Sequence, residues 1–175
     1  MKTLYLLSVV VLSSLLAVST AFAVPPDSKN FVAPLSGGEE VPARDTNARG
    51  NTIFQLNPEG TELSYKLIVA NIENVFGAHI HCGAEGVAAP VGVTLFAGPV
   101  GGGRVDGILA QGVITAPNAG NACGWADLAA VVAALRTGEA YVNVHTNDGV
   151  GLPDTGPGDF PGGEIRGQIE EGGPS

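Results

Sequence analysis

Residues 76–83 read FGAHIHCG, and residues 140–147 read AYVNVHTN. Together the two stretches contain all three histidines of the 175-residue chain. Side chains two residues apart on a β-strand lie on the same face of the sheet. Both stretches therefore predict strands with one apolar face toward the core and an opposite face that carries His79, His81 and His145. If the two strands are neighbours, the three imidazoles converge within reach of one metal ion.

The same alternation assigns the neighbouring side chains to faces. The core face is expected to carry Phe76, Ala78, Ile80, Ala140, Val142 and Val144. The histidine face is expected to carry Val75, Gly77, Tyr141 and Asn143. Tyr141 and Asn143 are candidates for orienting an imidazole by contacting it without binding the metal themselves. Simple filling of the space between strands is the alternative for both.

The ligand type indicates the metal. Imidazoles without thiolates suit copper or zinc, and copper is highest in the affinity order of divalent metals. We therefore expect copper as the cofactor, with zinc as the alternative ion. The competing interpretation is that these are surface histidines, because an antiparallel sheet normally has one polar face.

The rest of the chain breaks into short apolar runs separated by Gly, Pro, Asn and Asp, which is typical of an all-β sandwich or barrel. We expect eight strands, at 30–35, 51–56, 63–70, 76–81, 91–96, 105–114, 140–146 and 164–169. Residues 125–136 instead space Trp125, Leu128, Val132 and Leu135 at helical intervals and stop at Gly138. They predict one short α-helix near residues 125–137.

The N-terminus has the features of a secretory signal peptide. Lys2 precedes an apolar run diluted by serines, and Ala21 and Ala23 form a small-x-small cleavage signal, so we expect residues 1–23 to be removed. Residues 24–30 are then a linker. No second apolar run is long enough to span a bilayer, so no membrane attachment is expected after cleavage. A secreted or periplasmic location follows.

Cys82 and Cys123 are the two cysteines, and export takes them to an oxidising compartment. We expect a disulfide between them that fastens the helix to the HIHC strand, worth ~3–4 kcal/mol in the chain-entropy model. The alternative is that Cys82 ligates the metal as a thiolate. Its side chain is expected on the face opposite both neighbouring histidines, which argues against ligation.

Size and charge exclude some functions. The 152 residues of the expected mature chain fit one domain, with a net charge of −10 from seven basic and seventeen acidic side chains. Such a surface repels phosphate backbones, so nucleic acid is not an expected partner. In the long stretch 147–163, Asp148, Asp154 and Asp159 lack the spacing of a calcium loop, and a solvated acidic loop is the preferred interpretation.

Four stretches resemble the CHRD domain, which is named for its occurrence in chordin and also occurs singly in exported microbial proteins. They are FVAPLSGGEEVPA at 31–43, HIHCGAEGVAAPV at 79–91, LAAVVAALRTGEAYVNVHT at 128–146 and GGEIRGQI at 162–169. The resemblance covers residues 31–170 and leaves 171–175 as a C-terminal tail. It implies a β-rich extracellular domain without an assigned reaction.

A weaker resemblance links GAHIHCG, AYVNVHTN and GGEIRGQI, in that order, to the copper site of copper/zinc superoxide dismutases. It implies a Greek-key sandwich or barrel of about eight strands, with His79, His81 and His145 as copper ligands. It also implies an anion-guiding role for Arg166, although Arg166 could instead pair with an acid on the polar face of its strand. The chain has no bridging fourth histidine and no zinc-binding cluster.

Three functions are therefore open. The leading expectation is a small exported copper-binding β-domain that serves in metal handling or as a redox site. The second is an extracellular interaction or adhesion module without metal, because chordin binds extracellular growth factors. The third is a copper enzyme of the superoxide dismutase type.

Overall fold

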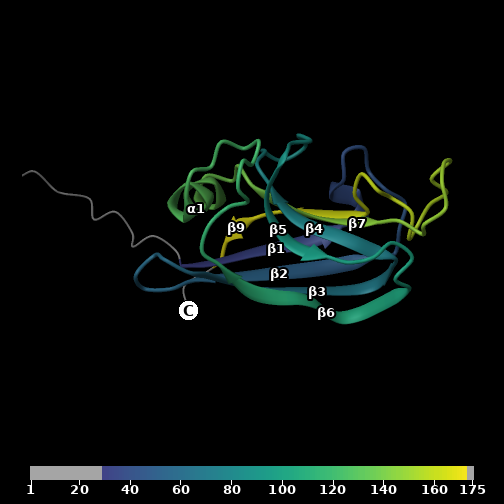
Figure 1. The fold of residues 1–175 in the computed structure, drawn as a ribbon, viewed down its shortest axis with the longest axis horizontal. Helices are drawn as coiled ribbons and strands as arrows, with labels where there is room; N and C mark the ends of the chain where they lie inside the picture. The colour runs from purple at the N-terminus through teal and green to yellow at the C-terminus, as the bar shows by residue number, and fades with distance from the viewer. Residues whose placement is uncertain (1–28, 173–175) are drawn as a thin grey trace, which may run out of the picture.

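The strands pair into one antiparallel sheet that curls into a nearly closed barrel (Figure 1). The computed structural model describes residues 29–172. In chain order its elements are β1 (Asn30–Ser36), the 3₁₀ turn η1 (Gly37–Glu39), β2 (Arg49–Leu56), β3 (Leu63–Glu73), β4 (Val75–His81), β5 (Val91–Ala97), β6 (Arg104–Ile114), α1 (Leu128–Arg136), β7 (Tyr141–Thr146), β8 (Ile165–Gln168) and β9 (Glu170–Glu171). The predicted class, an all-β sandwich or barrel with one short helix, is confirmed.

Strand order explains how distant parts of the sequence meet. The order is β5-β4-β7-β8-β1-β2-β3-β6, with β9 beside β1. After the β4–β5 hairpin the chain returns to place β6 against β3, which is a return of the Greek-key type. The edge strands β5 and β6 approach without pairing, and Tyr65 on β3 closes the gap by donating a hydrogen bond to the carbonyl of Leu95, 2.6 Å away. The pairing of β4 with β7 brings the two histidine stretches side by side.

The core follows the period-two pattern of the strands. Alternate residues of β1, β2 and β3 point into the barrel and are buried, among them Phe31, Ala33, Leu35, Phe54, Leu56, Leu63, Leu67 and Val69. Fully burying one such leucine or phenylalanine contributes about 1.5–3 kcal/mol. Ala140, directly before β7, and Val142 and Val144 on β7 face this core as expected, and all three are inaccessible to solvent.

A β-bulge corrects the expected phase at the start of β4. The register with β7 shifts between Val75 and Gly77, so strict alternation fails at Phe76. Val75 enters the core and is 4% exposed, whereas the Phe76 ring lies 6.1 Å from the ring of His145. An extra residue in one strand turns the side chains before it to the opposite face, which a sequence pattern does not reveal. The assignments of Val75 and Phe76 were therefore wrong, and those from Gly77 onward stand.

The helix is shorter than predicted. It begins at Leu128, because Asp127 is its N-cap and accepts a hydrogen bond from the backbone of Ala130 at 2.9 Å. Trp125 lies before the helix and packs over Gly92, where an added Cβ would clash with the indole. Cys123 does form the predicted disulfide with Cys82, so Cys82 carries no thiolate and its interpretation as a ligand was wrong.

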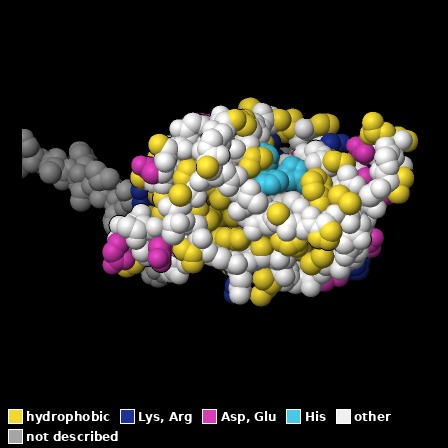
Figure 2. All heavy atoms as spheres, viewed as in Figure 1, with side chains coloured by type: hydrophobic (Ala, Val, Ile, Leu, Met, Phe, Trp, Pro, Cys, Tyr) yellow, Lys and Arg dark blue, Asp and Glu magenta, His cyan; other side chains and the backbone are white. Residues whose placement is uncertain are grey.

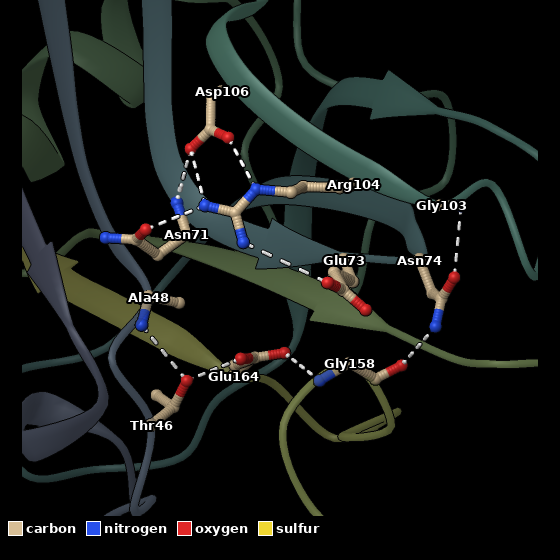
Figure 3. Close-up of polar contacts among 10 residues, drawn as sticks. All are labelled: Thr46, Ala48, Asn71, Glu73, Asn74, Gly103, Arg104, Asp106, Gly158 and Glu164. Carbon is tan, nitrogen blue, oxygen red and sulfur yellow. Dashed lines mark hydrogen bonds and ion pairs between the residues drawn. The ribbon is translucent and has the colours of Figure 1, made fainter.

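The segment 147–163 is held in place at its second half by buried polar contacts (Figure 3). The Glu164 carboxylate accepts hydrogen bonds from the hydroxyls of Thr46 and Thr146 and from the backbone of Gly158. Asn74 adds a bond to the Gly158 carbonyl at 3.2 Å. The three aspartates do not converge on an ion site, since the residues that the structure describes contain one such cluster, formed by the histidines.

The structure describes only part of the predicted signal peptide, linker and C-terminal tail regions. The predicted signal peptide 1–23 and most of the linker 24–30 lie outside the described residues. Glu171, the first residue of the predicted tail 171–175, continues the domain, because with Glu170 it forms the short strand β9 and pairs with Phe31 of β1. Within residues 29–172, no helix has the length and apolar character needed to cross a membrane.

Candidate metal centre

Strand register brings the three histidines together. Across the β4–β7 pair, Gly77 lies opposite His145 and His79 lies opposite Asn143. His79 and His81 share a face of β4, and His145 is the diagonal neighbour of His79 on β7. The ring centroids are 5.0 Å apart for His79 and His145, 5.6 Å for His81 and His145, and 5.8 Å for His79 and His81.

The triad could hold a metal ion. One ring nitrogen from each histidine lies within 4.8 Å of the other two. Two nitrogens that share an ion at ~2.0–2.1 Å can be at most about 4.2 Å apart, so loading an ion needs only small movements of the rings. Figure 2 shows the histidines together in a hollow of the surface, bordered by apolar side chains. Part of the triad is therefore open to solvent at this hollow.

Hydrogen bonds select the nitrogens that face the ion. Nδ1 of His81 lies 2.8 Å from the carbonyl of Ala89, and Nδ1 of His145 lies 3.0 Å from the carbonyl of Pro161. A carbonyl only accepts, so each Nδ1 donates and each Nε2 keeps its lone pair. Both Nε2 atoms, and Nδ1 of His79, are buried without a hydrogen-bond partner. This is the arrangement of metal-binding histidines, whose second nitrogen is normally held by a carbonyl or carboxylate.

Gly77 makes room for one of these rings. A Cβ at this position would lie 3.1 Å from Cε1 and 3.6 Å from Nε2 of His79. The His79 imidazole therefore lies over the bare backbone of its neighbour two residues earlier. Because Gly77 lies opposite His145, this close approach lets the His79 ring lie near the His145 ring.

The face that carries the triad is covered, which the sequence did not predict. His81 and His145 are 7% and 8% exposed, and Tyr141 and Asn143 are 2% and 4% exposed. The interpretation as surface histidines is therefore wrong for His81 and His145. The segment 83–90, which we call the strap, covers one end of the site.

The strap is fastened at several points. The disulfide holds Cys82 at its start. The backbone of Ala89 donates to the Tyr141 hydroxyl at 3.0 Å, and the Tyr141 ring stacks on His81 with centroids 4.8 Å apart. Tyr141 thus contacts a candidate ligand directly, as its predicted orienting role requires.

Arg166 lies under the strap instead of at the surface. It is 2% exposed and donates hydrogen bonds to the carbonyls of Ala84 and Val87, both at 3.0 Å. Its guanidinium carbon is 3.4 Å from the centroid of the Tyr141 ring, a cation–π contact. The acid nearest to it in sequence, Glu164, instead accepts from the hydroxyls described above, and Gln168 bonds backbone carbonyls.

Glu40 is a member of this site that sequence analysis missed. It is 7% exposed, and one carboxylate oxygen lies 3.5 Å from the amide nitrogen of Asn143. Burial raises the pKa of Glu40 to about 7, although the positive charges of Arg166 and Arg44 lower it. The sequence around Glu40 does not indicate a place in this site, because only the folded barrel brings the segment after β1 against β7.

Burial also sets the charge of the ligands. It lowers the pKa of His79 to about 4, with a further contribution from His81. Burial likewise lowers the pKa of His145 to about 4, and the other two histidines add to the shift. The pKa of His81 is lowered by burial and by Arg166, against the effect of its bond to Ala89. All three rings are neutral at pH 7, which is the form that ligates metals.

The fold and the site thus define a single-domain antiparallel β-barrel with a covered triad of neutral histidines. The CHRD domain family matches residues 31–153, and the chain belongs to that family. This match includes the three histidines, whereas Arg166 lies beyond it. Comparison with curated proteins gives no match, and comparison with solved structures gives none either. The likeness to superoxide dismutases therefore has no support from a relative.

Proposed function

We propose that this protein is exported and binds one copper ion through His79, His81 and His145, in metal handling or as a redox site. Two observations support it best. The three rings offer ligand atoms within 4.8 Å of one another. One buried nitrogen of each ring has no hydrogen-bond partner, while the opposite nitrogens of His81 and His145 are held by carbonyls. Buried polar atoms are normally satisfied, so these three are explained by a ligand. A purely imidazole set favours copper over harder ions, and zinc is the competing ion.

Export is supported by two independent features. The first 23 residues have the composition of a signal peptide. The disulfide between Cys82 and Cys123 is of the kind that persists in oxidising compartments. Both agree with a secreted or periplasmic metal site.

Calorimetric titration of the signal-free protein with Cu²⁺ and with Zn²⁺ tests the proposal. We expect one site per chain, with tighter binding of copper. The variant His79→Ala/His81→Ala should lose this site. The matched control Glu59→Ala/Glu62→Ala removes two exposed carboxylates from the distant β2–β3 turn and should bind as the wild type does. Equal weak binding by the wild type and the histidine variant would exclude the proposal.

An extracellular interaction module is the second candidate. Exposed apolar side chains favour it, because Val150 and Leu152 are 70% and 85% exposed in the loop after β7, which projects from the barrel (Figure 1). Val100 lies beside this loop and is 53% exposed. This function requires no metal, so it predicts that binding to a partner survives both chelation and the loss of His79 and His81.

A further inference from the structure

A buried positive charge lies behind one of the candidate ligands. Arg166 stacks on the Tyr141 ring at 3.4 Å, and Tyr141 stacks on His81 at 4.8 Å with the two planes within 9° of each other. The three side chains form one stack from β8 across β7 to β4. The charge therefore has a fixed position relative to the triad.

Nearby groups compensate this charge only partly. The guanidinium bonds the strap by donating from its two terminal nitrogens to the carbonyls of Val87 and Ala84, which carry no net charge. The acid that interacts with it, Glu40, is itself destabilised as an anion by burial. A positive field therefore reaches the triad along the stack of Arg166, Tyr141 and His81.

This field distinguishes between oxidation states of copper. A fixed positive charge repels Cu²⁺ more strongly than Cu⁺, and the repulsion is larger in a poorly solvated site than in water. The three neutral imidazoles add no negative charge to offset it. Cu²⁺ also prefers a tetragonal ligand set, whereas two adjacent strands supply three nitrogens.

We propose that the triad holds copper preferentially as the cuprous ion, and that Arg166 is the positioning residue that sets this preference without touching the ion. The inference rests on the proposed copper site and specifies the form of copper that this site takes up. The protein would receive copper from a source that supplies Cu⁺ and would release it to an acceptor of Cu⁺.

The expected size of the effect follows from Coulomb's law. For unit charges about 10 Å apart at an effective dielectric constant of about 20, removing the charge changes the ratio of Cu⁺ to Cu²⁺ affinity about tenfold. For a one-electron couple, tenfold corresponds to about 59 mV in reduction potential.

The test measures both affinities in the wild type, Arg166→Gln and Arg166→Lys. Cu⁺ affinity is measured anaerobically against a chromophoric Cu⁺ chelator, and Cu²⁺ affinity against a competing Cu²⁺ chelator. We expect the glutamine variant to lower the affinity ratio about tenfold and the lysine variant to retain most of it, because lysine keeps the charge. Equal shifts in the two variants, or no shift in either, would overturn the inference.

Two further variants control for indirect effects. Arg104→Gln removes the same charge from an exposed arginine that is bonded to Asp106 and Asn71 and not to the strap, and should leave the ratio unchanged (Figure 3). A shift as large as that of Arg166→Gln would mean that net charge alone is responsible, and would contradict the proposal. Glu40→Gln leaves the hydrogen bonds of Arg166 in place and should raise the ratio at pH 8. If the Arg166 variants do not fold, Glu40→Gln still decides the test. A ratio of Cu⁺ to Cu²⁺ affinity that does not rise in this variant would contradict the inference.

The outcomes separate this inference from the proposed function. If the wild type binds neither Cu⁺ nor Cu²⁺ more tightly than His79→Ala/His81→Ala, the copper site itself is wrong. If the wild type binds both ions at the triad but Arg166→Gln leaves their ratio unchanged, only the role of Arg166 is wrong.

Discussion

At the scale of single residues, Gly77 has the most specific steric role in the site. In Gly77→Ala the new Cβ would press on the His79 ring at 3.1 Å, which is closer than most Cβ contacts. Because the ring must move away from the other two, we expect about a tenfold loss of metal affinity, the lower range for a change behind a ligand. The measurement is calorimetric titration with copper alongside the unfolding midpoint.

Gly151→Ala is the matched control for this substitution. A Cβ there meets no atom within 4 Å, so affinity should not change. Equal affinities in Gly77→Ala and the wild type would show that the position of the His79 ring does not limit binding.

The residue pattern predicted part of this site and not the rest. Period-two spacing placed His79 and His81 on one face, and it placed Tyr141, Asn143 and His145 together on the other strand. It could not reveal the bulge at Phe76, because a bulge depends on the register of the partner strand. It also missed the carbonyls of Ala89 and Pro161, since backbone groups from distant segments have no side-chain signature.

At the scale of elements, the disulfide and the strap act together. In Cys82→Ser/Cys123→Ser, removing a crosslink over 41 residues of sequence should cost about 3–4 kcal/mol of unfolding free energy. The strap, which follows Cys82 directly, also holds His81 through Ala89, so metal affinity should fall as well. Urea denaturation measures the change in unfolding free energy, and metal titration of the same samples measures the change in affinity.

Asp127→Ala provides a control that destabilises without touching the strap. It removes the N-cap bond to Ala130 and should cost about 1 kcal/mol. Its metal affinity should equal that of the wild type. A loss of affinity in proportion to stability in both variants would contradict a specific role for the strap.

The elements themselves were largely predictable. Apolar alternation located eight strands to within a few residues at either end, because each buries one face in the barrel. Helical spacing located α1 but placed its start too early, since Trp125 fits the spacing while Asp127 caps the backbone after it. β9 has two residues, Glu170 and Glu171, and no pattern marks so short a strand.

At the scale of the whole molecule, the metal-free protein should lose stability in mild acid. The pKa of His79 and of His145 is about 4 in the folded state, below the ordinary value of 6.5. The unfolded chain therefore takes up protons that the folded chain does not, so this contribution to stability is complete above pH 6.5 and is lost as the pH falls toward 4. We expect the urea midpoint to drop over that range, and a midpoint that rises on acidification would contradict this.

Glu40 produces the opposite dependence at higher pH. Its pKa is raised from 4.5 to about 7, so the stability it contributes is complete below pH 4.5 and is lost as the pH rises through 7. The urea midpoint of the wild type should therefore fall between pH 4.5 and 8 relative to that of Glu40→Gln. Parallel curves for the two proteins would show that the carboxyl is not buried in the folded state.

Charge and burial over the whole molecule also bear on catalysis. A copper enzyme that dismutates superoxide needs an open coordination position and a route for an anion. Three histidines leave such a position, but the chain carries a net charge of −9, and Arg166 is 2% exposed with its nitrogens bonded to the strap. It is therefore not available to guide an anion, and a site that favours Cu⁺ is slow to pass through both oxidation states. We expect the copper-loaded protein to dismutate superoxide slowly or not at all, measured as the rate per bound copper against free aqueous copper. A rate near the diffusional ceiling of ~10⁸–10⁹ M⁻¹s⁻¹ that drops in Arg166→Gln would contradict this and assign the protein to the enzymes.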